Sequence, residues 1–242
     1  MPQLKWKLFD LFGIPVYIDI TFAIILIMFL QEGRTFSTGL AEALVLAVSI
    51  VAHEFGHALT GRAFGCDTRD ISLSFIGGCA SMMSMPRKGW QEFLVAAAGP
   101  AVSFALSGAA FLILLLVPIG SEFLVFTLYV LMWMNLVLGC FNLLPGFPMD
   151  GGRIFRSVMM LFVSRPKATF VAMCVGRVFA VLLALSGVYE LFHGGSWAFL
   201  RIFIAWMIWK DGYREYQLAL MESSWSYGDF RAKVSPPPYG DD

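Results

Sequence analysis

The stretch LAEALVLAVSIVAHEFGHALTGRAF, residues 40–64, guides the interpretation of the whole chain. It is apolar and long enough to cross a bilayer, which takes about 20 residues. His53, Glu54 and His57 stand within it in the pattern HExxH. Residues four apart share a helix face, so the two imidazoles can bind one Zn²⁺ while Glu54 reaches a water on the ion. Ionisable groups at membrane depth are costly and usually functional, so the pattern indicates a metal site.

The composition indicates an integral membrane protein. Of the 242 residues, 58% are hydrophobic and 14% are charged, against roughly 45–50% and 25% in soluble domains. The formal net charge is zero, which excludes a bulk basic field for nucleic acid. The four cysteines form no CxxC pair, and we interpret them as small buried apolar residues. They are Cys66, Cys79, Cys140 and Cys174.

The hydropathy pattern predicts an all-α polytopic membrane protein with about six transmembrane helices. The expected spans are residues 13–30, 40–64, 92–117, 123–147, 170–191 and 197–209. The first is short and holds Asp19, and the last is short enough to be an interfacial helix instead. Asp10 and Asp19 interrupt the region where the apolar core of a cleavable signal peptide would lie.

The distribution of basic residues predicts which side of the membrane each connection faces. With six alternating spans, fourteen Lys or Arg fall on the side of the two termini, and Arg34 alone falls on the other side. The positive-inside rule therefore places both termini in the cytoplasm of a multi-pass protein in the cell membrane.

Two segments outside the spans have their own predicted structure. Gly77 and Gly78 lie in the apolar segment 70–86, where alternation around the pair predicts a hairpin. At membrane level such a hairpin must be buried in protein or line a cavity. Residues 1–222 are expected to form one transmembrane domain with a core at about 40–153, and the polar, Pro-rich residues 223–242 a disordered cytoplasmic tail.

A catalytic zinc needs a third protein ligand and an open position. His193 and Glu190 fall on the predicted non-cytoplasmic side, whereas the HExxH motif lies nearer the cytoplasmic end of its span. Asp150 lies on the correct side, in the segment NLLPGFPMDGGR (142–153), whose prolines break the helix and whose glycines permit sharp turns. From the residues alone, Asp150 is either a metal ligand or a helix-capping residue at the water boundary.

Two polar residues of the fourth predicted span stand on one helix face. Asn135 and Asn142 are seven residues apart, so either could donate a hydrogen bond into the site or to a neighbouring helix. The small residues of the third predicted span, including Gly99 and Ser103, indicate close helix packing and are interpreted as structural.

Taken together, these motifs resemble the site-2 protease family of intramembrane zinc metalloproteases. The resemblance is carried by HEFGH (53–57) in an apolar span, AAAGP (96–100) in the next span, and FNLLPGFPMDGGR (141–153) closing the one after. The amino-terminal segment KLFDLFGIPVYIDITF (7–22) is similar to the short archaeal and bacterial members. Because the connections are short and about 30 residues follow the sixth expected span, we expect neither the PDZ insertion nor the carboxy-terminal CBS pair of other members.

The resemblance implies one Zn²⁺ per chain, held by His53, His57 and Asp150, with Glu54 as the catalytic acid and base. It places Asn142 near the site as a group for substrate or an oxyanion. It also implies that the hairpin with Gly77 and Gly78, together with residues 16–20, forms a small membrane-embedded sheet that presents substrate as an added strand. The implied activity is hydrolysis of single-span membrane proteins in or near the bilayer, without nucleic acid.

Three other functions remain open at this point. Another membrane zinc hydrolase, such as a prenyl-protein protease, also uses HExxH but takes a Glu or His as third ligand. A metal transporter or sensor would use the His pair to bind zinc transiently. An inactive scaffold would bind transmembrane partners but has no need of Glu54.

Overall fold

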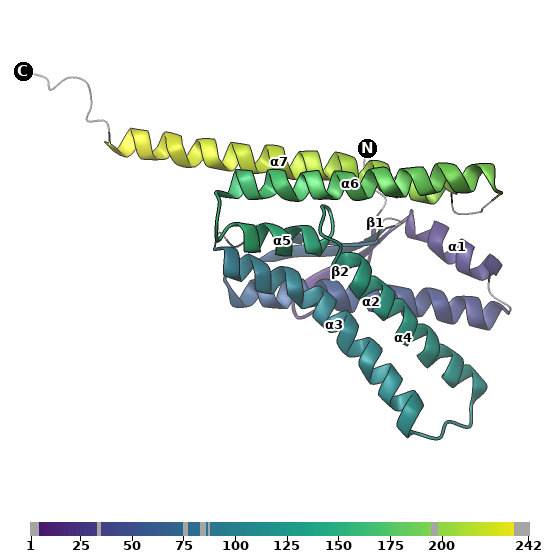
Figure 1. Cartoon of the computed structure of the whole chain (residues 1–242). Helices are drawn as coiled ribbons and strands as arrows, with labels where there is room; N and C mark the ends of the chain where they lie inside the picture. The colour runs from purple at the N-terminus through teal and green to yellow at the C-terminus, as the bar shows by residue number, and fades with distance from the viewer. Residues whose placement is uncertain are drawn as a thin grey trace, which may run out of the picture. The chain divides into compact units, whose positions relative to one another are not determined.

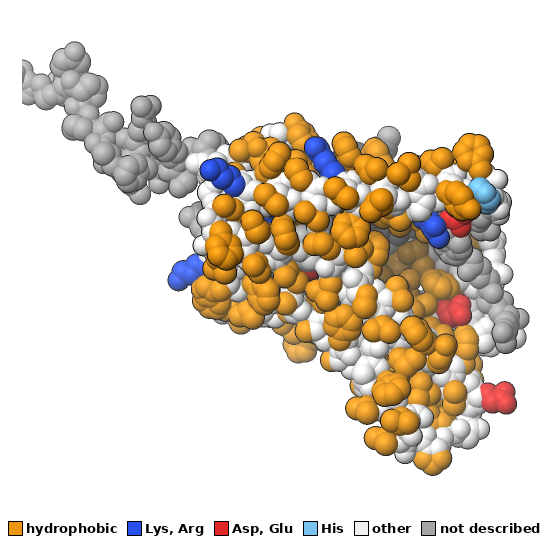
Figure 2. Space-filling model, viewed as in Figure 1, with side chains coloured by type: hydrophobic (Ala, Val, Ile, Leu, Met, Phe, Trp, Pro, Cys, Tyr) orange, Lys and Arg blue, Asp and Glu red, His pale blue; other side chains and the backbone are white. Residues whose placement is uncertain are grey.

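The computed structural model describes residues 5–32, 35–74, 77–82, 86, 88–194 and 198–234, with only the backbone for residues 32, 77, 79–82 and 224–234. The chain divides into two compact units, Met1–Leu143 and Leu144–Asp242. Hydrophobic side chains cover most of the helical surface in view in Figure 2. Among the described residues, four helices are long and apolar enough to cross a membrane. The chain is accordingly an integral membrane protein of mostly helical structure.

The first unit contains a four-stranded sheet in the order β1-β2-β3-β4. Its strands are β1 (Lys5–Leu11), β2 (Ile14–Asp19), β3 (Thr68–Ser74) and β4 (Gly77–Met82). β1 and β2 form a hairpin whose turn residues, Phe12 and Gly13, both have positive φ angles, as a tight two-residue hairpin turn requires. β2 pairs with β3 in parallel, and β3 pairs with β4 antiparallel. The predicted Gly-Gly hairpin and its pairing with the 16–20 region are confirmed.

Four helices complete the first unit (Figure 1). They are α1 (Phe22–Glu32), α2 (Phe36–Ala63), α3 (Gly89–Leu116) and α4 (Glu122–Asn142). α2 begins at a capping box, in which Thr35 and Thr38 each accept the other's backbone N–H. It ends before Gly65, whose positive φ closes the last turn: the N–H of Gly65 donates to the Arg62 carbonyl, and the N–H of Cys66 donates to the Gly61 carbonyl.

The sheet packs one face against α2. Ile14, Val16 and Ile71 are fully buried with Phe55 and Ala58 of the helix. A second cluster of Phe22, Leu73 and Ile50 continues this contact along α2. Burial of apolar side chains at roughly 25 cal/mol per Å² holds the strands on the helix that carries HExxH. The sheet therefore covers one side of the motif.

α3 covers another side of α2, and it does so through glycine. A Cβ placed on Gly56 would lie 2.7 Å from the carbonyl oxygen of Ala98, so only glycine allows the two backbones this close. α3 also packs on α4, where the Ser107 hydroxyl donates to the Met132 carbonyl at 2.8 Å. The small residues of α3 thus act in packing, as predicted from the sequence.

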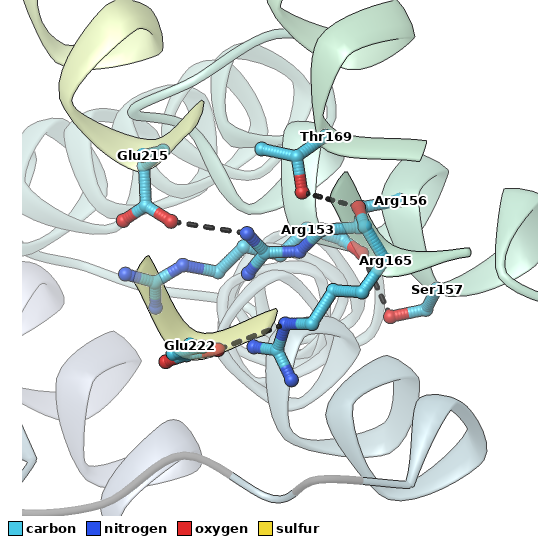
Figure 3. A network of polar contacts seen from close by, with 7 residues as sticks. All are labelled: Arg153, Arg156, Ser157, Arg165, Thr169, Glu215 and Glu222. Carbon is cyan, nitrogen blue, oxygen red and sulfur yellow. Dashed lines mark hydrogen bonds and ion pairs between the residues drawn. The ribbon is translucent and has the colours of Figure 1, made fainter. Parts of the chain in front are cut away.

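The second unit contains α5 (Asp150–Met159), α6 (Arg165–Phe192) and α7 (Ala198–Val234). α6 and α7 lie side by side along most of their length in Figure 1. Met149 packs in a buried cluster with Ala180 of α6 and with Ala205 and Ile208 of α7. Figure 3 shows two ion pairs in this unit, Arg156–Glu215 and Arg165–Glu222.

The spans differ from the sequence prediction at two places. The predicted span 13–30 is wrong as a single helix, because Ile14–Asp19 is a strand and only Phe22–Glu32 is helical. Asp19 accepts the backbone N–H of Thr21, which lowers the pKa of its carboxyl and fixes the break between strand and helix. The fourth span ends at Asn142, because the prolines that follow cannot continue a helix. The four confirmed candidates are α2, α3, α4 and α6.

Two further expectations meet the structure only in part. α7 extends to Val234, so residues 224–234 of the predicted tail belong to a helix, while residues 235–242 lie outside the described part of the chain. Cys66 is buried as predicted, but the interpretation is wrong for Cys140, which is exposed on α4. Exposed small apolar residues are expected on a helix that faces lipid. The side chain of Cys79 lies outside the described residues.

Candidate metal centre

The two histidines of HExxH meet on one face of α2, as the four-residue spacing predicts. The two Nε2 atoms lie 3.2 Å apart, with the rings inclined at 77°. His53 is 3% exposed and His57 is 6% exposed, so both imidazoles are almost fully removed from solvent. Two nitrogens at roughly 2.0–2.1 Å from a tetrahedral zinc ion lie roughly 3.3 Å apart. The observed separation fits this geometry.

Both Nδ1 atoms contact α3, which determines the orientation of the rings. The Nδ1–H of His57 donates to the carbonyl oxygen of Val95 at 2.7 Å. A carbonyl can only accept, so in the neutral imidazole Nε2 carries the lone pair. Nδ1 of His53 lies 2.9 Å from the hydroxyl of Ser103, which is itself fully buried. A donating Nδ1–H at His53 directs a second lone pair into the same space.

When His53 carries its proton on Nδ1, this arrangement suits a metal ion between the rings, whereas the other tautomer donates from Nε2 of His53 to Nε2 of His57. Two lone pairs 3.2 Å apart repel each other unless a cation lies between them. Ligating histidines in metalloproteins usually donate their other N–H to a carbonyl or a polar side chain, as His57 does to Val95 and as the Ser103 hydroxyl allows for His53. The residues present therefore suit zinc, which binds neutral imidazole nitrogen.

Gly99 leaves the space that the two imidazoles occupy. A Cβ at Gly99 would overlap Nε2 of His57, and would stand 2.5 Å from its Cε1 and 2.7 Å from Nε2 of His53. The interpretation of Gly99 as purely a packing residue was therefore incomplete. The same holds for Ser103, which the sequence analysis also interpreted only as a packing residue. A small residue on α3 does not reveal from the sequence that it contacts a histidine of α2. Only the AAAGP motif (96–100) indicated that Gly99 belongs to a family pattern.

Glu54 lies against strand β4. A Cβ at Gly78 would stand 2.7 Å from Cγ of Glu54 and 3.0 Å from its carboxylate Oε1, and would also overlap Ile50. Glu54 is half-buried, one residue along the helix from His53. The glycine of the hairpin thus lets the strand backbone approach the carboxylate directly. β4 is an edge strand, and among the described residues no strand pairs with its outer edge.

Asp150 lies in the second unit as the first residue of α5, and it is 7% exposed. The sequence left two roles for it, and its position at a helix N-terminus agrees with favourable charge there. No cap hydrogen bond is made by the side chain of the preceding residue, Met149. Two imidazoles and one buried carboxylate are donor groups that can hold a metal ion. The residues that offer them are His53, His57 and Asp150. Two nitrogens and one oxygen from protein are typical of catalytic zinc.

The other polar residues that the sequence singled out bind neighbouring backbone or side-chain groups. Asn142 donates from Nδ2 to the carbonyl of Leu138 one turn back on α4. Asn135 is fully buried and donates to the hydroxyl of Ser49 on α2, which is the helix-to-helix alternative that the sequence left open. In the second unit, His193 is exposed at the end of α6, and Glu190 pairs with Arg201 at 3.2 Å. Neither of the last two carries a sign of metal ligation.

Comparison with known proteins identifies the family. The model of peptidase family M50 matches residues 41–124 and 118–186. A zinc metalloprotease of Methanocaldococcus jannaschii is 35% identical over an alignment of 193 residues, and the match covers 76% of this chain and 54% of that protein. The Synechocystis protein sll0528 is 34% identical over an alignment of 225 residues, and the match covers 84% of this chain and 57% of that protein. The chain spans about half the length of the curated relatives it matches.

A solved structure agrees with the fold as well as with the sequence. The site-2 protease from Methanocaldococcus jannaschii superposes with a TM-score of 0.66 at 29% sequence identity. The match covers 88% of this chain and 95% of that one. With the family model spanning more than half of the residues, and with HExxH paired on α2, the chain belongs to peptidase family M50, the family that the resemblance to site-2 proteases indicated.

Proposed function

We propose that this chain is an intramembrane zinc metalloprotease that hydrolyses peptide bonds in or near transmembrane segments of membrane-tethered proteins. The observation that carries the proposal is the pair of Nε2 atoms 3.2 Å apart on an apolar helix, with Glu54 beside them. Membership of family M50 and relatives named zinc metalloproteases support it. A transporter or scaffold would leave Glu54 without a role.

The chemistry follows from the side chains around the pair. A zinc ion held there would supply Lewis-acid polarisation and would lower the pKa of a water to roughly 7. Glu54 is the base that takes a proton from the attacking water and returns it to the amine nitrogen of the departing peptide. Ser103 and the Val95 carbonyl hold the imidazole rings in place while this occurs.

Asp150 is the third ligand in this proposal. Its carboxylate is buried, and Asp150 is the first residue of α5. The turn that precedes it contains Pro145 and Pro148. Burial makes the charged form of a carboxylate costly, and coordination of a metal ion would offset that cost. Asp150→Asn keeps the shape and weakens the ligand, so it should reduce zinc content strongly. Unchanged zinc would favour a different third ligand and a different type of membrane hydrolase.

Substrate presentation is assigned to the outer edge of β4. A transmembrane helix hides its carbonyls in hydrogen bonds, so a substrate must unwind before hydrolysis. An extended segment that pairs with an edge strand gains backbone hydrogen bonds in exchange. Gly77 and Gly78 provide an edge without side chains next to Glu54, which supports this route.

Asn142 is proposed as a donor to substrate or to an oxyanion. It is the last residue of α4, directly before the turn that leads to Asp150. Its bond to the Leu138 carbonyl uses one amide hydrogen and leaves the second for a substrate oxygen. Asn142→Ala should then lower kcat by about 10²–10³-fold, the usual effect of losing such a donor.

We also propose the membrane arrangement expected from the charges. α1 and the apolar first part of α7 join the four long helices as outer spans, which gives about six in total. Both termini face the cytoplasm of the cell membrane.

The proposed function is tested with detergent-purified protein and a panel of single-span substrates. The expected result is cleavage that a zinc chelator abolishes and added Zn²⁺ restores. Tight stoichiometric zinc without cleavage of any panel member would contradict the proposal and favour a metal sensor.

A further inference from the structure

The turn that ends in Asp150 is fixed by contacts within the second unit. A Cβ on Gly146 would stand 2.6 Å from Cα of Gly176 on α6, so the turn lies directly on that helix. A Cβ on Gly152 would in turn meet the Gly146 carbonyl carbon at 2.6 Å, so α5 folds back on the turn. Phe147, between these glycines, is fully buried. The backbone before Asp150 therefore has little freedom while α5 stays in place.

Arg156 holds α5 in place from the other side. Its guanidinium lies 4.9 Å above the ring of Phe147, which is a cation–π contact. The same guanidinium donates to the carboxylate of Glu215 on α7 at 3.1 Å. Its side chain is 3% exposed and that of Glu215 is 26% exposed, so water screens this ion pair little. Figure 3 shows Arg156 reaching from α5 toward Glu215.

We propose that Arg156 is a positioning residue that holds Asp150 in its ligating conformation by linking α5 and the Phe147 turn to Glu215 of α7. This rests on the proposed function, in which Asp150 binds zinc. In this proposal α7 changes the affinity for the metal through the contact of Glu215 with Arg156, although none of the proposed ligands lies on α7. A displacement of α7 would release Arg156 from Glu215 and lower the affinity for metal.

The chain offers a matched control pair on the same helix. Glu222 lies seven residues after Glu215, hence on the same face of α7, and pairs with Arg165 at 3.5 Å. Arg165 is the first residue of α6, so this ion pair joins α6 to α7. The Glu222 carboxylate is 62% exposed, so its loss should have little effect. Glu222→Gln tests whether the loss of any negative charge from α7 lowers the affinity for the metal.

The experiment measures the affinity of the full-length protein for Zn²⁺ and Co²⁺ in detergent by competition with a chelator. Glu215→Gln and Arg156→Lys should each weaken binding by about 10-fold, the lower range for loss of a group supporting a ligand. Glu222→Gln should leave the affinity within about twofold, as is usual for an exposed pair. The Co²⁺ absorption bands should change in the first two variants and not in the third.

A double-mutant comparison separates positioning from a general loss of stability. In an Asp150→Asn background, Arg156→Lys should cause no further loss of affinity, since its effect passes through Asp150. If single variants fail to fold, Arg156→Met combined with Glu215→Leu removes the pair without leaving a buried charge, and it should also bind about 10-fold more weakly. Wild-type affinity in folded variants, or additive losses with Asp150→Asn, would overturn the proposal. Wild-type affinity in Asp150→Asn would instead overturn Asp150 as a ligand.

Discussion

At the scale of single residues, the orientation of the histidine pair depends on α3. The rings come from α2, but both Nδ1 atoms are held by Val95 and Ser103, and the space between them exists because residue 99 is glycine. These contacts were not predictable from the HExxH spacing, which fixes only that two imidazoles share a face. Metal affinity should therefore be sensitive to substitutions on α3 that leave the motif intact.

Gly99→Ala should abolish metal binding. The added methyl would occupy the position of the imidazole Nε2 atoms, and neither helix backbone can move away in a packed pair. Zinc content after purification measures this. Gly108→Ala on the same helix is the control, because a Cβ there meets nothing within 4 Å. Equal zinc in both variants would contradict the placement of the rings.

Ser103→Ala should weaken zinc binding by about 10-fold and leave the fold intact, because the His53 ring loses the partner of its Nδ1 atom. Chelator competition measures the affinity. Ser107→Ala, one turn further along α3, removes a hydroxyl that donates to Met132 instead and should keep wild-type affinity. A loss of the same size in both variants would show that Ser103 acts only through helix packing.

At the scale of elements, the long apolar segments were predictable and the amino-terminal span was not. α2, α3 and α6 begin and end within a few residues of the expected bounds, since length and apolarity alone define them. Residues 13–30 are equally apolar but divide at Asp19 into a strand and a short helix. Apolarity does not distinguish a buried strand from part of a helix. The Gly-Gly hairpin was predictable because alternation and glycine coincide there.

The approach of β4 to α2 gives a prediction at this scale. Gly78→Val should reduce cleavage at least 10²-fold while zinc content stays at the wild-type level, because the new side chain displaces Glu54 but not the histidines. Zinc content and cleavage rate measured on the same preparation separate the two effects. Loss of zinc together with activity would mean that β4 supports the metal ligands rather than Glu54.

At the scale of the whole molecule, four long apolar helices and the excess of basic residues in alternate connections define a polytopic protein. The meeting of His53 and His57 on one face was predictable, since HExxH is a local signal, whereas Asp150 as third ligand stays a prediction that the family resemblance supplied. The contact between Arg156 and Glu215 was not predictable, because two residues 59 apart in the sequence leave no local pattern.

The positive-inside arrangement gives a prediction for this scale. In a cysteine-free background, Gly120→Cys should react with a membrane-impermeant maleimide in intact cells, and Lys88→Cys should react only after permeabilisation. Both positions lie in connections beside α3, on its opposite ends. Labelling of Lys88→Cys in intact cells would reverse the proposed orientation of the protein.

The most direct test of the central claim compares wild type with Glu54→Gln in cleavage of a tethered single-span substrate, with bound zinc quantified in both. The amide keeps the size of the side chain and removes the proton acceptor, while the histidine pair and its contacts to α3 stay as they are. We expect equal zinc in the two proteins and cleavage by the wild type only. Full cleavage by Glu54→Gln at equal zinc would contradict the account.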